Sequence, residues 1–426
     1  MEKVNYEVQI VETIQEFFSY AQKGYFELKM TPFLKKQILS IFQAKDYFKE
    51  NELLWYAKLL LETNEEKNVL FAKEILKDLS NEHHPMVGVI LGEYYYQIHN
   101  MPLAFGYFLL AAHKKDPKAE YFMGKFYQGG YDIKPNKKLA QHWLKRSSEH
   151  GYVKADYALA VSYYKRKEPS VQLAKKYIVR AYKAHLVEAY DLLGTFYLEG
   201  FAYKKNEEKA FALFLEAAKL QEPSAMYHLG YCYKLGLGTL RDDIAMLYWY
   251  KKAAERQEVH ALYELGMCYL WGIGTLISYT KAYGYFKHGK ELGSNDCILE
   301  FARLYEEGKG VEKDEEKAFK TYLELAKQED IKGAFEFGRC LYYGIGTKKD
   351  VEGAIIFLLK ARREGVIGAE KLVRLYYRSY KAKEQEEKPT NLIERVFVEK
   401  ANFVPLKIKN LSGALSNQPN KKSERT

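Results

Sequence analysis

The chain has 426 residues, of which 47% are hydrophobic and 29% are charged, so we expect a packed core with a solvated exterior. Its net charge is +10, which favours acidic partners only weakly when it is spread over such a length. The sequence has no uninterrupted apolar run of the roughly 18 residues that a transmembrane helix needs, and its first residues are acidic where a targeting peptide would be basic. We therefore expect an intracellular protein, cytoplasmic by default; a mitochondrial location, or a membrane association through a partner, stays open.

Residues 1–50 are predicted to form a helical cap. Apolar residues recur at helical spacing between Val8 and Tyr25, and a second helix is expected to begin at Thr31-Pro32. Neither segment shows the repeat that dominates the rest of the chain. Because the end of a repeat array exposes apolar surface, we expect these two helices to cover it.

Residues 51–383 are predicted to form an array of repeats, degenerate over 51–83 and clear from about residue 84. Clear copies begin at Ser224 (SAMYHLGYCYKLGLGT) and, 36 residues later, at His260 (HALYELGMCYLWGIGT). One recurring position holds a small residue, usually glycine, until Arg374 ends the series: Gly92, Gly124, Ala160, Gly194, Gly230, Gly266, Ala302 and Gly338. A second position holds a residue suited to a helix N-cap: Asn68, Asn100, Asn136, Ser170, Asn206, Asp242, Ser278, Asp314 and Asp350.

The spacing between these two positions predicts stacked helical hairpins. From each cap to the next small residue there are always 24 residues, whereas from the small residue to the next cap there are usually 12, but 10 after Ala160 and 8 after Gly92. Length variation is therefore confined to one loop, where it is tolerated because loops bury little. We call the helix with the small residue helix A, and the helix that follows the cap helix B.

Further repeat positions are assigned to the packed interior. A tyrosine stands three residues after nearly every small residue, and we expect it in a packed seam with its hydroxyl reaching a polar partner. Three of the four cysteines, Cys232, Cys268 and Cys340, lie two residues after the small position, so we interpret them as core residues and not as a disulfide framework. The recurring Gly-x-Gly, such as Gly236 and Gly238, is predicted to end helix A with positive φ.

The pattern A-x-x-x-L-G-x-x-Y-x-x-G-x-G, followed by an N-cap and A-x-x-(W/Y/F)-(Y/F/L), resembles the Sel-1-like repeat, a relative of the tetratricopeptide repeat. One copy is carried by Ala225, Leu229, Gly230, Tyr233, Gly236, Gly238, Trp249 and Tyr250. The resemblance covers roughly residues 84–380 and implies an all-α, right-handed superhelical solenoid of stacked hairpins with a concave, partner-binding face. It also implies a non-catalytic adaptor. Because we find no convincing catalytic, cofactor or metal motif, we expect neither an enzyme nor a bound cofactor.

A second row of side chains on helix A is the candidate partner-binding site. It comprises the positions three before, one after and four after the small residue, which lie on one side of the helix, off the tyrosine seam. Aromatic residues and arginine, which dominate binding hot spots, are frequent in this row. We expect a protein partner, presented as an extended peptide or a helix, to contact Tyr227, Tyr231, Lys234, Tyr263, Met267, Leu270, Phe335, Arg339 and Tyr342. The alternative is that these residues only pack between neighbouring repeats.

The C-terminal part carries a second candidate site. Between Lys360 and Lys383 basic residues outnumber acidic ones, and tyrosines lie among them. A helix over 360–383 could therefore bind nucleic acid, or it could be a solvated terminal helix. The patch would consist of Arg362, Arg363, Lys371, Arg374 and Arg378. Residues 384–426 are polar and predicted to be largely disordered, although 391–409 could fold back on the solenoid or dock to a partner.

Overall fold

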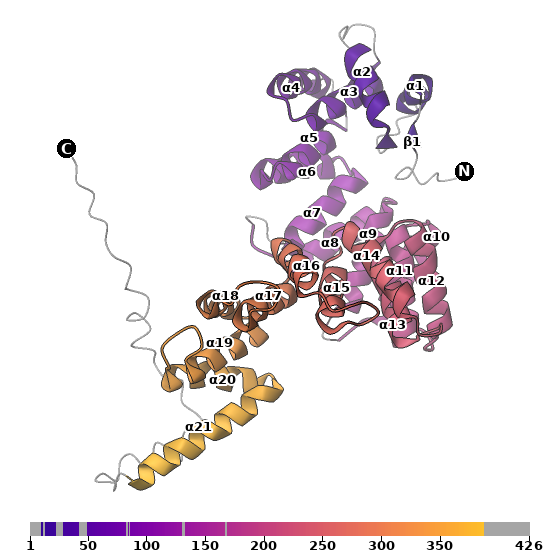
Figure 1. Cartoon of the computed structure of the whole chain (residues 1–426). Coiled ribbons are helices and arrows are strands. Elements are labelled where there is room, and N and C mark those ends of the chain that lie inside the picture. The colour runs from indigo at the N-terminus through magenta and orange to yellow at the C-terminus, as the bar shows by residue number, and fades with distance from the viewer. Residues whose placement is uncertain are drawn as a thin grey trace, which may run out of the picture. The chain divides into compact units, whose positions relative to one another are not determined.

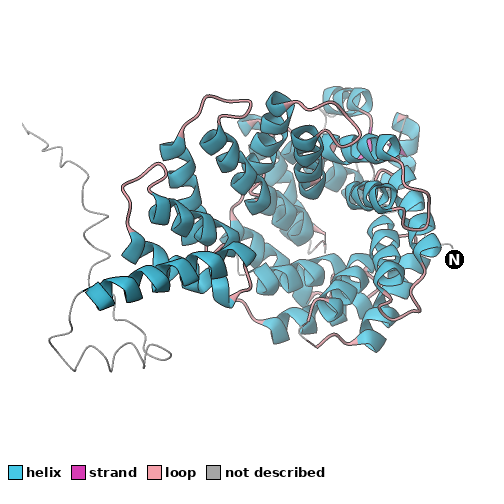
Figure 2. Ribbon diagram, turned by 60° about the horizontal axis from the view of Figure 1, so that its bottom comes forward, coloured by secondary structure: helices cyan, strands magenta, loops and turns pink. Residues whose placement is uncertain are grey.

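The structure is a computed structural model, in which one helix follows another with loops between them (Figure 1). Nearly all of the described chain is helical (Figure 2). Two strands of two residues each, β1 (Ile10–Val11) and β2 (Lys29–Met30), pair in parallel near the first helices. The structure describes residues 10–11, 13–22, 29–41, 49–81, 84, 86–129, 133–166 and 168–386. The tail from 387 to 426, with our prediction for 391–409, lies outside the described residues.

The chain divides into two compact units, Met1–Leu292 (unit 1) and Gly293–Thr426 (unit 2). Unit 1 begins with α1 (Ile14–Gln22) and α2 (Pro32–Ile41) and continues as helical hairpins. These are α3 (Glu50–Glu62) with α4 (Glu66–Asn81), α5 (Val87–Gln97) with α6 (Met101–His113), α7 (Pro117–Gly129) with α8 (Lys137–Glu149), α9 (Val153–Tyr164) with α10 (Val171–Lys183), α11 (Val187–Glu199) with α12 (Glu207–Lys219), α13 (Pro223–Leu235) with α14 (Asp243–Glu255), and α15 (Val259–Trp271) with α16 (Tyr279–Glu291). Unit 2 contains α17 (Asn295–Glu307) with α18 (Glu315–Lys327), α19 (Ile331–Tyr343) with α20 (Val351–Arg363), and the terminal α21 (Ile367–Glu386). The predicted all-α solenoid of stacked hairpins is confirmed.

The predicted caps join the two helices of each hairpin. Asp242, for example, accepts hydrogen bonds from the first-turn N–H groups of Ile244 and Ala245, which have no partner within the helix. We call the residue three after the small position, a tyrosine in all of these hairpins except for Leu341, the ladder residue. The cap residue's own N–H donates to the carbonyl of the ladder residue at the end of helix A, at 2.8–3.1 Å in every hairpin from α5/α6 to α19/α20. This bond closes the short loop between Tyr95 and Asn100 as well as longer loops, so loop length varies without moving the helix ends.

One predicted cap is wrong and another is incomplete. Because α4 begins at Glu66, Asn68 lies inside the helix, where its amide donates to the Thr63 hydroxyl at 3.1 Å and to the Glu65 carboxylate at 3.0 Å. In this degenerate repeat, helix B therefore begins earlier than the spacing of the predicted caps indicates. Ser170 holds the cap position of α10, but its side chain makes no capping hydrogen bond.

The small residue of helix A admits a large side chain from helix B. A Cβ atom at Gly266 would lie 2.3 Å from the ring of Phe286, which is closer than carbon atoms can approach. Equivalent clashes, at 2.5–2.8 Å, would occur between Gly92 and Phe108, Gly124 and Leu144, Gly194 and Phe214, and Gly230 and Tyr250. All five helix B residues are fully buried, so this contact is the centre of each hairpin.

The ladder tyrosines pack against helix B, as predicted. Tyr269 stacks on Tyr285 with ring centroids 5.6 Å apart. A lysine three residues after the cap lies over the tyrosine ring: the distance from Nζ to the centroid is 5.1 Å for Lys281 over Tyr269 and 3.9 Å for Lys317 over Tyr305. Lys317 also donates to the Tyr305 hydroxyl at 2.8 Å. These cation–π contacts give the seam a polar outer edge.

Each Gly-x-Gly loop lies between the two helices of one hairpin and packs against the preceding hairpin. Gly236 and Gly238 have φ values of +73° and +66°, a region that favours glycine, and Gly236 ends α13 as predicted. A Cβ atom at Gly238 would lie 2.2 Å from the carbonyl oxygen of Glu207, the first residue of α12 in the preceding hairpin. The second glycine is therefore needed for close contact between neighbouring repeats.

All four cysteines are buried thiols, which confirms that they are core residues. Burial raises the pKa of Cys232, Cys268 and Cys340 to about 12, so each remains protonated at neutral pH.

The Gly266 contact predicts opposite effects for two alanine substitutions. Gly266→Ala should destabilise the protein by about 1–3 kcal/mol, because the new methyl group overlaps the Phe286 ring. Gly284→Ala, at a helical site with no neighbouring atom within 4 Å, should stabilise it by about 0.5–1 kcal/mol. Urea unfolding followed by circular dichroism measures both. Equal effects of the two substitutions would contradict the proposed packing.

Candidate functional site

In unit 1, the predicted row on helix A forms a band of half-buried aromatic side chains. Tyr227 stacks on the buried Tyr250 with centroids 5.8 Å apart and lies 5.4 Å from the ring of His260 on the next helix A. Tyr231 follows one turn later, 6.5 Å from Tyr227. Lys234 reaches across to α15, where its Nζ lies 2.6 Å from Oε2 of Glu264. The band thus bridges two repeats and keeps part of each ring exposed.

The next repeat continues the band. The ring centroids of Tyr263 and Phe286 lie 6.2 Å apart. Met267 follows Tyr263 by four residues on the same helix and is half-buried. Leu270 is only 8% exposed and belongs to the core. It offers too little surface to contact a partner, so we leave it out of the proposed contact surface.

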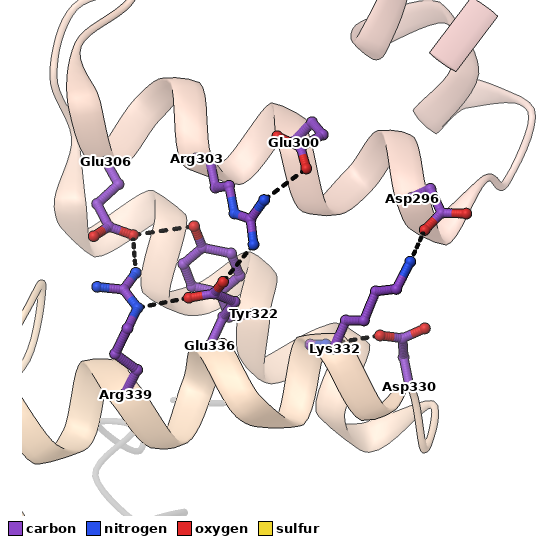
Figure 3. Close-up of polar contacts among 10 residues, drawn as sticks. Asp296, Glu300, Arg303, Glu306, Tyr322, Asp330, Lys332, Glu336 and Arg339 are labelled. Carbon is purple, nitrogen blue, oxygen red and sulfur yellow. Dashed lines mark hydrogen bonds and ion pairs between the residues drawn. The ribbon is translucent and has the colours of Figure 1, made fainter. Parts of the chain in front are cut away.

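In unit 2, the same row is occupied by an ion-pair network between α17 and α19 (Figure 3). Arg339 binds Oε2 of Glu306 and Oε2 of Glu336, both at 2.6 Å. Arg303 binds Oε1 of Glu300 at 2.7 Å and Oε1 of Glu336 at 2.6 Å. Glu336 is only 4% exposed, and both arginines bind its carboxylate. Arg339 therefore has a packing role between repeats.

The remaining predicted residues of unit 2 pack against the end of the array. The Phe335 ring covers Gly368 in α21, where a Cβ atom would lie 2.5 Å from it. Tyr342 is half-buried and lies 5.1 Å from the ring of Tyr343.

Two equivalent buried tyrosines of helix B differ in their hydroxyl contacts. Tyr322 donates to Oε2 of Glu306 at 3.0 Å, and its ring is drawn between Arg303 and Arg339 (Figure 3). Tyr250 occupies the same repeat position in α14, but its hydroxyl has no hydrogen-bond partner among the described residues. The residue equivalent to Glu306 in that repeat is Lys234, whose ammonium group can donate but cannot accept.

This difference predicts unequal effects of removing the two hydroxyl groups. Tyr322→Phe should destabilise the protein by about 1–2 kcal/mol, because a buried hydrogen bond to a charged group is lost. Tyr250→Phe should be neutral or slightly stabilising, because the removed hydroxyl is buried without an acceptor. Urea unfolding of the two variants side by side tests the contrast, and an equal loss of stability would contradict it.

An open pocket of about 430 Å³ lies among the A helices of the first hairpins. Four half-buried lysines line it: Lys58, Lys118, Lys125 and Lys154. Its one carboxylate is Glu93, which lies 2.7 Å from Nζ of Lys118 and 3.7 Å from Nζ of Lys58. The aromatic part of the lining comprises Tyr96, Tyr121, Phe122 and Tyr152. The pocket is therefore strongly cationic, with an aromatic floor.

Further along unit 1, the starts of the A helices carry a cluster of acidic groups. Burial, and then the charges of Glu188, Asp191 and Glu258, raise the pKa of Glu222 to about 7. Nδ1 of His228 lies 2.6 Å from Oδ1 of Asp191. The cluster therefore holds more negative charge at pH 8 than at pH 6.

The raised pKa of Glu222 predicts a stability that falls with pH. Its pKa is about 7 in the folded state and near 4.5 when unfolded, so between these values the folded state binds the extra proton and stability is lost as pH rises. At pH 8 Glu222→Gln should be more stable than wild type by about 1 kcal/mol, a figure reduced because the side chain is half-exposed. At pH 5 the two should melt alike. The exposed Glu255→Gln variant is the control, and a pH-independent difference for Glu222→Gln would contradict the assignment.

The basic C-terminal patch does not lie on one helix, which corrects our expectation of a helix over 360–383. Arg362 and Arg363 end α20, and Gly365, with φ +80°, turns the chain before α21 begins. Lys371, Arg374 and Arg378 are exposed on α21. Glu370 binds Arg374 at 2.7 Å and Arg362 at 3.5 Å, which neutralises part of the patch.

The lysine pocket was missed although the repeat register points to it. Relative to Gly92 and Gly124, Glu93 and Lys125 occupy the position one after the small residue, and Tyr96 the position four after it. These are positions of the predicted row, continued into earlier repeats. The predicted row uses only copies from Ser224 onward, and the same positions in the copies at Gly92 and Gly124 hold these residues.

Within the described part of the chain, no helix is both long and apolar enough to cross a lipid bilayer. The same residues include no group of three or more His, Cys, Asp or Glu side chains arranged to hold a metal ion.

The fold and the repeat register define an α-solenoid of helical hairpins. The model of the Sel1 repeat family matches residues 117–152, 149–166, 187–222, 223–257, 259–294, 299–330 and 331–366. These segments span more than half of the chain, which therefore belongs to the Sel1 repeat family.

Solved structures of other repeat proteins are similar to this chain. A Sel1 repeat protein from Oxalobacter formigenes is 25% identical, with a TM-score of 0.48 over 57% of this chain and 95% of that one. The protein c5321, a protective antigen of uropathogenic Escherichia coli strains with an SLR fold, is 18% identical, with a TM-score of 0.41 over 84% of this chain and 98% of that one. A comparison with curated proteins found no match.

Proposed function

We propose that the protein is a non-catalytic adaptor that holds a protein partner on the A-helix face of unit 1. Proteins of the Sel1 repeat family are generally protein-interaction scaffolds and typically non-catalytic. The finer assignment, a partner held as an extended peptide or a helix by Tyr227, Tyr231, Tyr263, Met267 and their neighbours, is our proposal.

The observation that carries the proposal is the half-exposed aromatic band on α13 and α15. The hairpin core is already filled by Tyr250 and Phe286, which pack against Gly230 and Gly266. Tyr231 therefore lies outside that core contact, with part of its ring in solvent. Rigid, partly exposed tyrosines on neighbouring helices provide the contacts that dominate protein–protein binding energies.

Partner capture by the tagged, full-length protein from its own cells tests this function. Tyr231→Ala/Tyr263→Ala should reduce the nuclease-resistant co-purifying proteins by at least about fivefold, because two aromatic contacts are lost. The amounts are compared by quantitative mass spectrometry. Arg339 is unsuitable for this test because removing it would take away a cation that Glu306 and Glu336 share.

Tyr248→Ala is the matched control, since Tyr248 is 53% exposed on α14, a helix B. It should leave capture unchanged. If the double variant, with helicity and melting temperature preserved, captures the same proteins in the same amounts, the A-helix face is not the binding surface.

A further inference from the structure

The lysine pocket has a defined electrostatic preference. It brings together four ammonium groups and one carboxylate from four A helices, α3, α5, α7 and α9. Lys118 and Lys58 already share Glu93, with Nζ to carboxylate distances of 2.7 and 3.7 Å. Lys125 and Lys154 add two further positive charges to the lining. An anionic ligand is therefore favoured, and it would compete with Glu93 for Lys118.

The aromatic floor of the pocket is poorly suited to stacking bases. Phe122 gives one face to Phe108, with centroids 4.3 Å apart and planes 8° from parallel. The ring planes of Tyr96 and Phe122 meet at 62°, and those of Tyr121 and Phe122 at 76°, so these rings pack edge to face on one another. Binding of single-stranded nucleic acid relies on ring faces that bases can cover. This arrangement favours a peptide over a nucleic acid.

The charge along the A-helix face reverses beyond the pocket. Lys118, Lys154 and Glu188 occupy the same repeat position, six residues before the small residue, in α7, α9 and α11. Glu188 belongs to the acidic cluster with Asp191 and Glu222. A nucleic acid carries negative charge along its whole length and would be repelled there. A peptide can place acidic residues at the lysines and other residues at the acidic cluster.

We propose that the lysine pocket binds the carboxylate side chains of an acidic peptide segment of the protein partner. This assignment rests on the proposed adaptor function and names the chemistry of its ligand. The lysines supply charge at the pocket lining, and Lys118 exchanges Glu93 for a carboxylate of the peptide. The acidic cluster sets the orientation, since the acidic end of the peptide is excluded from it.

Fluorescence anisotropy with defined probes tests the proposal on the full-length protein. The probes are a labelled peptide of about twelve residues built from Glu and Phe, the same peptide with Lys in place of Glu, and a single-stranded RNA of equal negative charge. The acidic peptide should bind in a salt-dependent manner, and the other two should bind at least about tenfold more weakly.

Two variants with opposite expected effects keep the test independent of folding defects. Lys125→Ala/Lys154→Ala should raise the Kd for the acidic peptide at least about fivefold, because two cations are lost. Glu93→Gln should lower it, because Lys118 and Lys58 are released from their internal carboxylate. Lys138→Ala/Lys145→Ala, which removes two exposed lysines from α8, is the matched control and should have no effect.

The proposal is overturned if the acidic peptide does not bind, or if it binds the Lys125→Ala/Lys154→Ala variant and wild type equally. It is also overturned if the RNA binds as tightly as the peptide and loses affinity in the same variant, which would assign the pocket to nucleic acid. If the acidic peptide does not bind but Tyr231→Ala/Tyr263→Ala still reduces partner capture, the pocket proposal fails and the adaptor function stands. The two failures are therefore distinguishable.

Discussion

The hydrogen bond from the cap residue's N–H to the carbonyl of the ladder residue is the constraint on which the hairpins depend. It recurs at 2.8–3.1 Å wherever the register is clear, whether the loop between the two residues is as short as Tyr95–Asn100 or as long as Tyr127–Asn136. Because it fixes the end of helix A relative to the start of helix B, the side chains of both helices meet in the same way in each repeat. The glycine of helix A then receives the large residue of helix B, and the lysine after the cap covers the tyrosine ring.

This fixed geometry leaves one side of helix A free to differ between repeats. In unit 2 it carries Arg303 and Arg339 with three glutamates, which connect α17 to α19 (Figure 3). On α13 and α15 it carries tyrosines, and on the first hairpins it carries lysines around Glu93. A buried ion pair rarely adds much net stability, but breaking one leaves an uncompensated charge. The array therefore combines a constant interior with a face whose chemistry changes along the chain.

The sequence was sufficient for the hairpins, because their determinants are local and repeated. The caps and glycines recur at fixed spacing, and their roles follow from the geometry of helix ends. Asn68 shows where this reasoning fails. It is a residue suited to an N-cap and lies at the cap spacing of a degenerate repeat, yet α4 starts two residues before it. The prediction of one helix over 360–383 was wrong for a similar reason. Gly365 lies within a charged segment and gave little indication that α20 ends just before it.

The candidate site was less predictable because it depends on contacts between repeats. Sequence periodicity placed Arg339 on the correct side of its helix, but it could not show that Glu306, on the preceding helix A, would bind the guanidinium group. Nor could it show that Lys58 and Lys118 converge on Glu93, since these residues lie in three successive A helices. Such contacts depend on the distance between neighbouring hairpins, which the spacing of residues along one helix does not give.

Site-specific photo-crosslinking tests most directly whether the A-helix face is the binding surface. A photoreactive phenylalanine analogue is placed at position 231 on α13 or, in a separate protein, at position 248 on α14, and the tagged protein is irradiated in its own cells. The proposed surface predicts that the captured partner crosslinks from position 231 and not from position 248. Crosslinking from position 248 alone would contradict it and would place the partner on the B helices.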